Sequence, residues 1–401
     1  MGGTIMEEKT ADSGRFFTAP VLTLMALGFV LGSCEYVVVA ILPDIAEGLN
    51  ASLGAVGKLV GVFAAGYAVG TPIVTAATGR VPRFRLLMVL MGLVLGANAL
   101  SMLAPNLWVL YAARALAAVL TGTLTAVALL FVGEVTPPEH TAKAVSMVYA
   151  GMSLATVVGN PLNKTICRLL GWRAAFAVIV AVGVLLLPVL LRTLPRSGAS
   201  AGGSGFLRQF AVLRDRRYSL CVLMTIACYA ATYVVYTYLT PILTDVLGVG
   251  EDAVSPLLMV VGLCCVTSNL LAGWLGERDG VSKTPVVLVM QAVLFFAMPF
   301  LLRGRWVGIV SVLGMCLLMY AISTPVQVHA LALAKREHPY AMNLCASTLS
   351  VAGNIGIALG SFASSELQAA VGMERLGFPA AAVALAGLGL NLLLLRACRR
   401  G

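Results

Sequence analysis

The stretch GSCEYVVVAILPDIA, residues 32–46, ends an apolar run that covers residues 17–41. Such a run is long enough to cross the hydrocarbon core of a bilayer, which takes about 20 apolar residues, so it predicts a membrane-spanning helix. It follows a mixed-charge tail and shows no small-residue cleavage site, so we expect it to be retained rather than removed as a signal peptide. Glu35 is the one acidic residue of the run 17–41. It is therefore predicted to lie inside the membrane, where a carboxylate is costly.

Similar apolar runs recur along the whole chain of 401 residues, of which 60% are hydrophobic and 11% are charged. An average soluble domain has about 25% charged residues, so we expect an all-α membrane protein without a large soluble domain. The runs predict twelve transmembrane helices in two pseudo-symmetric halves of six. The first six cover residues 17–41, 59–77, 86–103, 107–132, 144–166 and 174–191, and the second six cover residues 218–243, 254–275, 285–302, 306–334, 341–363 and 376–395.

The distribution of Lys and Arg predicts the orientation of the chain. If the amino terminus is cytoplasmic, nineteen of the 27 basic residues face the cytoplasm, seven, among them Lys164, face outward, and only Arg114 lies well within a span. The positive-inside rule therefore places both termini in the cytoplasm of a multi-pass inner-membrane protein. The net charge of +10 follows from this topology, so it does not indicate a nucleic-acid partner.

Matching positions in the two groups of six indicate a duplicated unit. Pro43 and Pro241 lie 198 residues apart, at the ends of the first and seventh spans. Arg80 and Arg278, each after the second span of its half, have the same separation of 198 residues. We predict halves at residues 1–195 and 218–401, with substrate bound between them. Residues 196–217 form a linker, either with an amphipathic helix on the cytoplasmic surface or without fixed structure.

Glu35 and Arg114 are the predicted proton-coupling residues. Both lie roughly 12 Å from the outer ends of their helices, so they can meet if those helices are neighbours. A nearby cation favours the ionised carboxylate and desolvation favours the protonated one, and this opposition suits a group that binds and releases a proton. The alternative is a static buried ion pair, or a permanently neutral Glu35, that only holds helices together.

The seventh predicted span carries a face of tyrosines. The position that corresponds to Glu35 at the offset of 198 residues is Tyr233, and Tyr229 and Tyr236 lie on the same helical face. The two halves are therefore chemically unequal, with the proton chemistry assigned to the first. The tyrosine face is expected either to stack against planar solutes or to serve helix packing.

Isolated polar residues within the spans complete the candidate substrate contacts. Such side chains often bond only to neighbouring helices, so a structural role is the alternative for each. No metal or cofactor is expected, because the nine cysteines match no zinc-binding spacing. The candidates are Tyr36, Asn98, Thr121, Asn160, Asn269, Gln327 and Asn354.

Small residues mark the predicted moving surfaces. Gly159, in the fifth span, is followed by Asn160 and Pro161, and Gly360 is its counterpart 201 residues later in the eleventh. Small residues let helices approach closely, and a proline removes a backbone hydrogen bond and bends a helix. These positions are expected to let the halves rock, although tight static packing would have the same pattern.

These residues together resemble the major facilitator superfamily over nearly the whole chain, and in particular its drug:proton antiporter branch of bacterial arabinose, sugar and purine-nucleoside efflux pumps. The similar segments are CEYVVVAILPDIAEGL at 34–49, VFAAGYAVGTP at 62–72, TGTLTAVAL at 121–129 with Arg114, GMSLATVVGNPL at 151–162 and GWRAAF at 171–176. The resemblance implies a rocker-switch fold, a coupling role for Glu35 with Arg114 as its partner, and antiport rather than symport.

The loop after the second span departs from the family pattern. Gly79 stands where an acidic residue is usual, and Pro82 where glycine is common. The corresponding second-half loop, GWLGERDG at 273–280, keeps Glu277 and Arg278. We therefore expect Arg80 to contribute less to the cytoplasmic gate than Glu277 and Arg278.

The sequence predicts a secondary transporter, a monomer that exports a small organic molecule such as a drug, sugar or purine nucleoside in exchange for protons. A metabolite importer or facilitator of the same fold is the alternative. An intramembrane enzyme or receptor is disfavoured, because the spans carry no HExxH or Asp pair and the chain has no signalling domain. No ATP-binding loop is present either.

Overall fold

The computed structural model describes residues 18–78, 81–137, 140–196, 210–276, 280–338 and 342–400, which form helices joined by short turns and contain no strand. The first half consists of α1 (Ala19–Ala40), α2 (Leu42–Gly48), α3 (Leu53–Ala77), α4 (Arg83–Met102), α5 (Leu107–Val135), α6 (Thr141–Leu154), the π-helical turn η2 (Ala155–Gly159), α7 (Asn160–Leu170) and α8 (Trp172–Thr193).

The second half begins after a short 3-10 helix, η3 (Phe210–Arg214). Its elements are α10 (Arg216–Tyr236), α11 (Leu239–Pro241), η4 (Ile242–Val246), α12 (Glu251–Gly276), α13 (Gly280–Leu301), α14 (Arg305–Leu318), α15 (Ser323–Glu337), α16 (Met342–Val371), η6 (Met373–Arg375) and α17 (Gly377–Arg400).

Each of the twelve predicted spans has a helical counterpart. Eleven helical segments of the described chain are long and apolar enough to cross a membrane, and α16, a helix of 30 residues, occupies the place of the eleventh predicted span. The predicted fold class, twelve helices in two six-helix halves, is therefore confirmed. Most of the predicted linker, residues 197–209, lies outside the described residues.

Three of the predicted spans are interrupted. The prediction of one continuous helix was therefore wrong for these spans. The fifth contains the π-helical turn η2 between α6 and α7, and the seventh ends at Tyr236 before the short α11. The tenth breaks between α14 and α15. Helix breaks inside a membrane protein leave backbone groups that must find other partners. At the tenth, the Tyr320 backbone N–H donates to Ser268 Oγ at 2.8 Å.

Polar side chains at two helix starts explain why those helices begin where they do. The Ser52 hydroxyl accepts a hydrogen bond from the Ala55 backbone N–H, and the Asn106 side chain accepts one from Val109. These are N-caps, which satisfy amide groups that the first turn leaves unpaired. The cap at Ser52 starts the second span at Leu53, six residues before the predicted start at residue 59.

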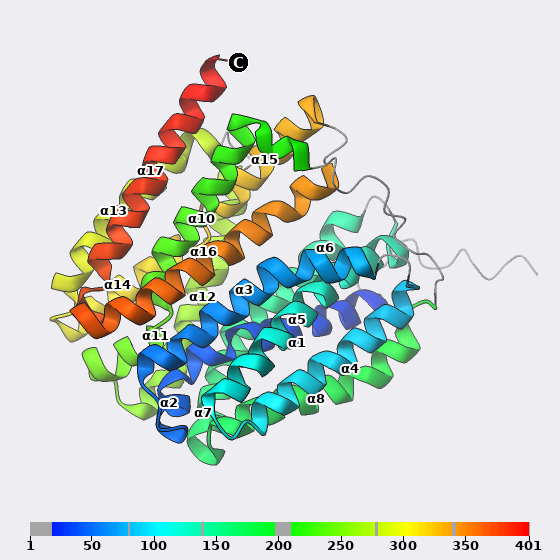
Figure 1. Cartoon of the computed structure of the whole chain (residues 1–401), viewed down its shortest axis with the longest axis horizontal. Helices are drawn as coiled ribbons and strands as arrows, with labels where there is room; N and C mark the ends of the chain where they lie inside the picture. Colours follow the sequence, from blue (N-terminus) through cyan, green and yellow to red (C-terminus); the bar gives the residue numbers. More distant parts are fainter. Residues whose placement is uncertain are drawn as a thin grey trace, which may run out of the picture.

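The halves lie side by side, with the first half drawn blue to green and the second green to red (Figure 1). They meet along two pairs of helices. In one pair α3 runs beside α16, and in the other α12 packs on η2 and α7. The first pair consists of spans two and eleven, and the second of spans eight and five. Spans two and eight hold equivalent places in their halves, as do spans five and eleven, so the pseudo-symmetry relates one pair to the other.

Glycines bring helices within each half into backbone contact. A Cβ atom added at Gly151 of α6 would lie 2.0 Å from the Met25 carbonyl oxygen of α1, and one at Gly28 would lie 2.3 Å from the Val148 oxygen. In the second half, a Cβ at Gly360 would lie 2.5 Å from the Ala230 oxygen. Only glycine permits approaches of this kind, which are typical of helix packing in membranes.

Candidate functional site

Glu35 lies five residues before the end of α1 and is the centre of the candidate site. Its neighbours Cys34 and Val37 are fully buried, whereas Glu35 and Tyr36 keep partial exposure. A carboxylate in a membrane span is expensive unless it is paired, protonated or in contact with water. Partial exposure of Glu35 therefore leaves it accessible to an exchangeable proton.

Arg114 is fully buried on α5 and reaches across to α1. Its Nη2 donates to the Cys34 carbonyl oxygen at 2.5 Å, and its guanidinium carbon lies 4.4 Å from the centre of the Phe63 ring. The Nε and Nη1 atoms have no hydrogen-bond partner within the described part of the chain. A buried cation with unused donors is costly and can accept a further anionic or carbonyl partner.

Glu35 and Arg114 lie close enough to interact electrostatically. No ion pair within 4 Å joins them in the described ranges, because the Arg114 guanidinium is held by the Cys34 carbonyl and the Phe63 ring. The structure therefore brings the two residues to one place without a static salt bridge between them.

Six tyrosines, here called the tyrosine cluster, gather around Glu35 from both halves. Four of them lie within electrostatic reach of its carboxylate: Tyr36, Tyr67, Tyr229 and Tyr233. The other two join through ring contacts, with centroids 6.2 Å apart for Tyr229 and Tyr320 and 5.2 Å apart for Tyr233 and Tyr236. Tyr320 also lies within hydrogen-bonding reach of Tyr36 and Tyr233.

The predicted tyrosine face of the seventh span is thus part of the candidate site. Tyr229 is partly exposed, whereas Tyr233 and Tyr236 are nearly buried. Tyr233, the counterpart of Glu35 at the offset of 198 residues, faces it across the junction of the halves. A carboxylate enclosed by phenol rings and hydroxyls combines apolar stacking surface with hydrogen-bond donors.

The other predicted polar contacts are more scattered. Asn98 is fully buried and donates to Cys34 Sγ at 3.2 Å and to the Val94 carbonyl at 2.8 Å, so it ties α4 to α1. Thr121 is fully buried, and Asn160 is 4% exposed at the start of α7. Among the described residues, no hydrogen bond joins Asn98, Thr121 or Asn160 to the tyrosine cluster. None in this part of the chain joins Asn269, Gln327 or Asn354 to it either.

The predicted gating residues fall into two groups. Arg80, Glu277 and Arg278 lie outside the described residues, so their predicted roles stay predictions. Gly159 packs against Ser33 of α1 and Gly360 packs on α10, each within its own half, whereas Pro161 at the start of α7 lines a pocket together with Pro256 of α12. A glycine that does lie between the halves is Gly262 of α12, where an added Cβ would be 2.6 Å from the Thr156 carbonyl oxygen.

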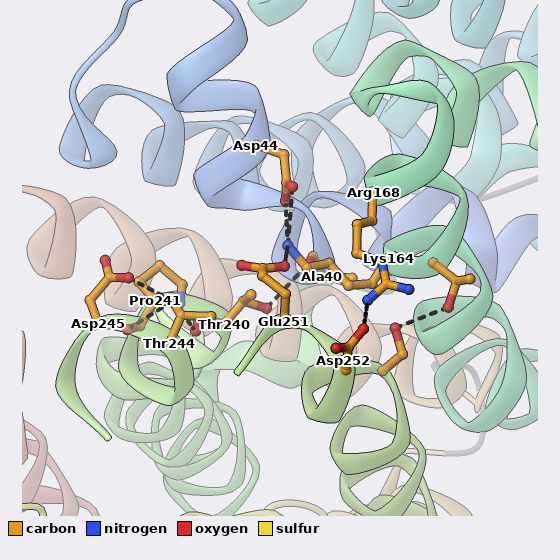
Figure 2. Close-up of polar contacts among 12 residues, drawn as sticks. Ala40, Asp44, Lys164, Arg168, Thr240, Pro241, Thr244, Asp245, Glu251 and Asp252 are labelled. Carbon is orange, nitrogen blue, oxygen red and sulfur yellow. Dashed lines mark hydrogen bonds and ion pairs between the residues drawn. The ribbon is translucent and has the colours of Figure 1, made fainter. Parts of the chain in front are cut away.

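Polar contacts between the halves gather at the end of the bundle opposite the start of α1 and the end of α17, which we call the closed end (Figures 1 and 2). Lys164, with a side chain 3% exposed, holds both carboxylate oxygens of Asp44 at 3.0 and 2.9 Å. Its Nζ also lies 3.3 Å from Glu251 of the second half. The buried ammonium group is therefore shared between two carboxylates, which compensates for its desolvation.

Further contacts surround this lysine. Arg168 forms an ion pair with Asp252, and the Thr165 hydroxyl donates to Ser255 Oγ at 3.0 Å. The Thr240 hydroxyl donates to the Val39 carbonyl at 2.8 Å, near the end of the helix that carries Glu35. Lys58 pairs with Glu366 at 2.5 Å where α3 meets α16. Both helix pairs at the junction of the halves are thus fastened at the same end.

In these ion pairs between the halves, each half contributes charges of one sign. The first half supplies the cations Lys58, Lys164 and Arg168. The second half supplies the anions Glu366, Glu251 and Asp252. Oppositely charged faces attract each other and fix their register, so the closed end is built as a complementary interface.

Sequence reasoning missed three residues of these sites. Tyr67 lies in the segment VFAAGYAVGTP, which contributed to the family resemblance but was not identified as part of a site. Tyr320 lies in an apolar span, and no sequence pattern marks it as a site residue. Lys164 was assigned to an outward-facing loop. Its four-residue spacing to Arg168 was the available sign that two cations share one helix face.

Comparison with known proteins agrees with this architecture. The family model described as "Major Facilitator Superfamily" matches residues 24–361. The chain is 29% identical to the "Uncharacterized MFS-type transporter YtbD" of Bacillus subtilis over 88% of its length and 89% of the relative. It is 28% identical to the "Inner membrane transport protein YdhP" of Escherichia coli over 94% of its length and 96% of the relative.

A solved structure gives the same fold. The crystal structure of a bacterial homologue of the human lysosomal transporter Spinster, in an inward-facing and unoccupied conformation, superimposes with a TM-score of 0.77. The likeness covers 96% of this chain and 98% of that one at 16% sequence identity.

The fold defines a multi-pass membrane transporter of small molecules rather than an enzyme. The chain belongs to the major facilitator superfamily.

Proposed function

We propose that the protein exports a small organic molecule in exchange for protons, with Glu35 as the group that carries the proton. The observation on which this depends is a single partly exposed carboxylate at the junction of the halves, beside Arg114 but not ion-paired with it in the described residues. A static buried salt bridge would offer no such freedom.

The surroundings of Glu35 favour a proton that can be exchanged. The positive charge of Arg114 stabilises the ionised carboxylate, whereas burial by apolar rings favours the neutral acid. A substrate that donates hydrogen bonds or a positive charge to the ionised carboxylate therefore favours proton release, and proton uptake by Glu35 favours departure of the substrate. This competition is the coupling that an antiporter needs.

The tyrosine cluster is the proposed substrate wall. It takes rings from α1, α3, α10 and the break between α14 and α15, so both halves contribute to it. Phenol rings stack against planar or amphipathic solutes, and their hydroxyls add hydrogen bonds. A drug, a purine nucleoside or a sugar fits this chemistry.

The closed end is the proposed outer gate. The excess of Lys and Arg on the side of the termini supports a cytoplasmic location for both, and the oppositely charged ion pairs would then close the external side of the bundle. The similar Spinster homologue was solved in an inward-facing conformation, which supports the same interpretation. Opening outward then requires that Lys164 and Arg168 leave the second half.

Inverted membrane vesicles test the proposal. Imposing a pH gradient should drive accumulation of substrate by the wild-type protein, and Glu35→Gln should abolish it, because glutamine cannot bind and release a proton. The control is Glu47→Gln, an exposed residue of α2 that forms no ion pair in the described ranges. Gradient-driven transport by Glu35→Gln at the wild-type rate would refute the coupling role, and accumulation only in right-side-out vesicles would indicate an importer.

A further inference from the structure

An apolar groove with a volume of about 510 Å³ lies on the outside of the first half, away from the tyrosine cluster. It runs between α1 and α8 and is bordered by the end of α6 and by η2. All of its lining side chains are hydrocarbon or thioether, among them Met25, Phe29, Val158, Val182, Leu185 and Val189. Leu185 is 72% exposed, so the groove faces the membrane.

The packing of α1 explains why this groove exists. Gly28 and Gly151 draw α1 and α6 together until their backbones touch. The end of α8 is tied to α1 at a separate point, where the Thr193 hydroxyl lies 3.1 Å from the Thr23 hydroxyl. Between these two fixed points the helices stand apart. From Val182 to Val189 the open stretch of α8 measures about 10 Å.

The end of the groove nearest the chain termini is polar and basic. The Thr23 and Thr193 pair closes the apolar stretch, and Arg192 follows on α8 within a turn of Val189. Arg192 and Arg196 are exposed, and neither forms an ion pair with any carboxylate in the described part of the chain. Two unpaired guanidinium groups therefore lie where a membrane helix meets the lipid headgroups.

We propose that this groove binds one anionic phospholipid from the leaflet on the side of the chain termini. An acyl chain lies between α1 and α8, the threonine pair meets the ester region, and Arg192 and Arg196 hold the phosphate. Arginine pairs phosphate in a bidentate manner, and burial of acyl methylenes in the groove strengthens lipid attachment.

The lipid would touch two elements of the transport machinery. Phe29 and Met25 belong to the helix that carries Glu35, and Val158 belongs to η2 of the fifth span. The proposal does not depend on the direction of transport or on proton coupling, because it rests only on the groove and its basic end.

Native mass spectrometry of the full chain in detergent can test this site. The protein is titrated with phosphatidylglycerol or with phosphatidylcholine of the same acyl chains. We expect severalfold higher retention of phosphatidylglycerol by the wild-type protein, and loss of that preference in Arg192→Gln/Arg196→Gln. The matched control Arg216→Gln removes an exposed arginine of α10 with no ion pair in the described ranges and should keep the preference.

A second variant tests the apolar part of the groove. Ala26 is exposed on α1 and lines the groove, so Ala26→Phe fills it without crowding the core. Its retention of both lipids should fall, whereas Ala363→Phe, on an exposed position of α16, should not change it. Equal retention of the two lipids by the wild-type protein, or an unchanged preference in the double arginine variant, would overturn the proposal.

Discussion

Lys164 of the first half lies 3.3 Å from Glu251 of the second while both oxygens of Asp44 hold its ammonium group. The two partners are not equivalent. Asp44 belongs to the same half as Lys164 and has a side chain 24% exposed, whereas Glu251 is 57% exposed. The lysine can therefore release Glu251 without losing its own partner, so this pair can open and close repeatedly at little cost.

Lys164→Met should weaken the closed end. The substitution leaves Asp44 and Glu251 facing each other without the cation between them, and like charges at short range repel. We expect a larger mean distance between spin labels on α2 and η4 in a cysteine-free background, measured by double electron–electron resonance. Arg168→Met is the matched control and should change the distance less, because exposed ion pairs are worth only about 0–1 kcal/mol. An unchanged distance in Lys164→Met would contradict the gate.

Arg114→Met should move the pH profile of transport toward higher pH. Without the cation, the ionised form of Glu35 loses the stabilisation of a nearby positive charge, so proton release requires a lower proton concentration. The measurement is the initial rate in inverted vesicles as a function of internal and external pH. A profile that keeps its midpoint while the rate falls would show that Arg114 only holds α1 through Cys34.

Tyr320→Ala should weaken substrate binding more than Tyr320→Phe. Alanine removes the ring that contacts Tyr229, whereas phenylalanine keeps the ring and loses only the hydroxyl near Tyr36 and Tyr233. Aromatic contacts are worth about 0.5–1.5 kcal/mol, so the apparent KM for export should rise roughly two- to thirteenfold in the alanine variant. Tyr111→Ala, which lies at the closed end and bonds to the Ala55 carbonyl, serves as the control. Equal KM values for Tyr320→Ala and the wild-type protein would remove Tyr320 from the substrate wall.

Much of the fold could be predicted because a bilayer imposes simple rules. Long apolar runs predicted twelve spans, each of which has a helical counterpart, and a near-constant offset of 198 to 201 residues predicted the two halves. Glu35 and Arg114 stood out because charged residues within spans are rare. Their location beside each other required only that α1 and α5 be neighbours.

The remaining features depend on contacts that periodicity does not encode. Tyr67 and Tyr320 join the tyrosine cluster only because α3 and the break before α15 approach α1 in space. The breaks at η2 and at the tenth span carry no charged residue, so hydropathy cannot reveal them. Lys164 is predictable as a loop cation, but its burial follows from the way α7 meets α12.

Gly360→Ala should destabilise the protein, whereas Gly389→Ala should not. The new methyl group at position 360 would lie 2.5 Å from the Ala230 carbonyl oxygen, so α16 and α10 must move apart. Overpacking of this kind costs about 1–3 kcal/mol. At Gly389 nothing lies within 4 Å, and alanine is favoured over glycine in a helix by about 0.5–1 kcal/mol. Thermal unfolding in detergent separates the two, and a higher melting temperature in Gly360→Ala would contradict the close packing.

The cluster of Asp215, Arg217 and His338 at the start of α10 should make the stability of the folded protein depend on pH. Burial alone would raise the pKa of Asp215, but hydrogen bonds from His338 and Arg217 outweigh it and hold that pKa below its ordinary value. The ionised Asp215 therefore stabilises the folded state at every pH above the ordinary aspartate pKa of about 3.9, and this stabilisation is lost as the pH falls through the lower, folded-state pKa.

Asp215→Asn tests this dependence, because asparagine keeps the N-cap of α10 and removes only the charge. The variant should melt below the wild-type protein at about pH 6, and the gap should close as the pH approaches about 3. Asp245→Asn, at an exposed aspartate of η4 that hydrogen-bonds only to the neighbouring Thr244 among the described residues, should show no such convergence. A gap of constant size across the whole pH range would mean that the loss of stability does not come from the charge of Asp215.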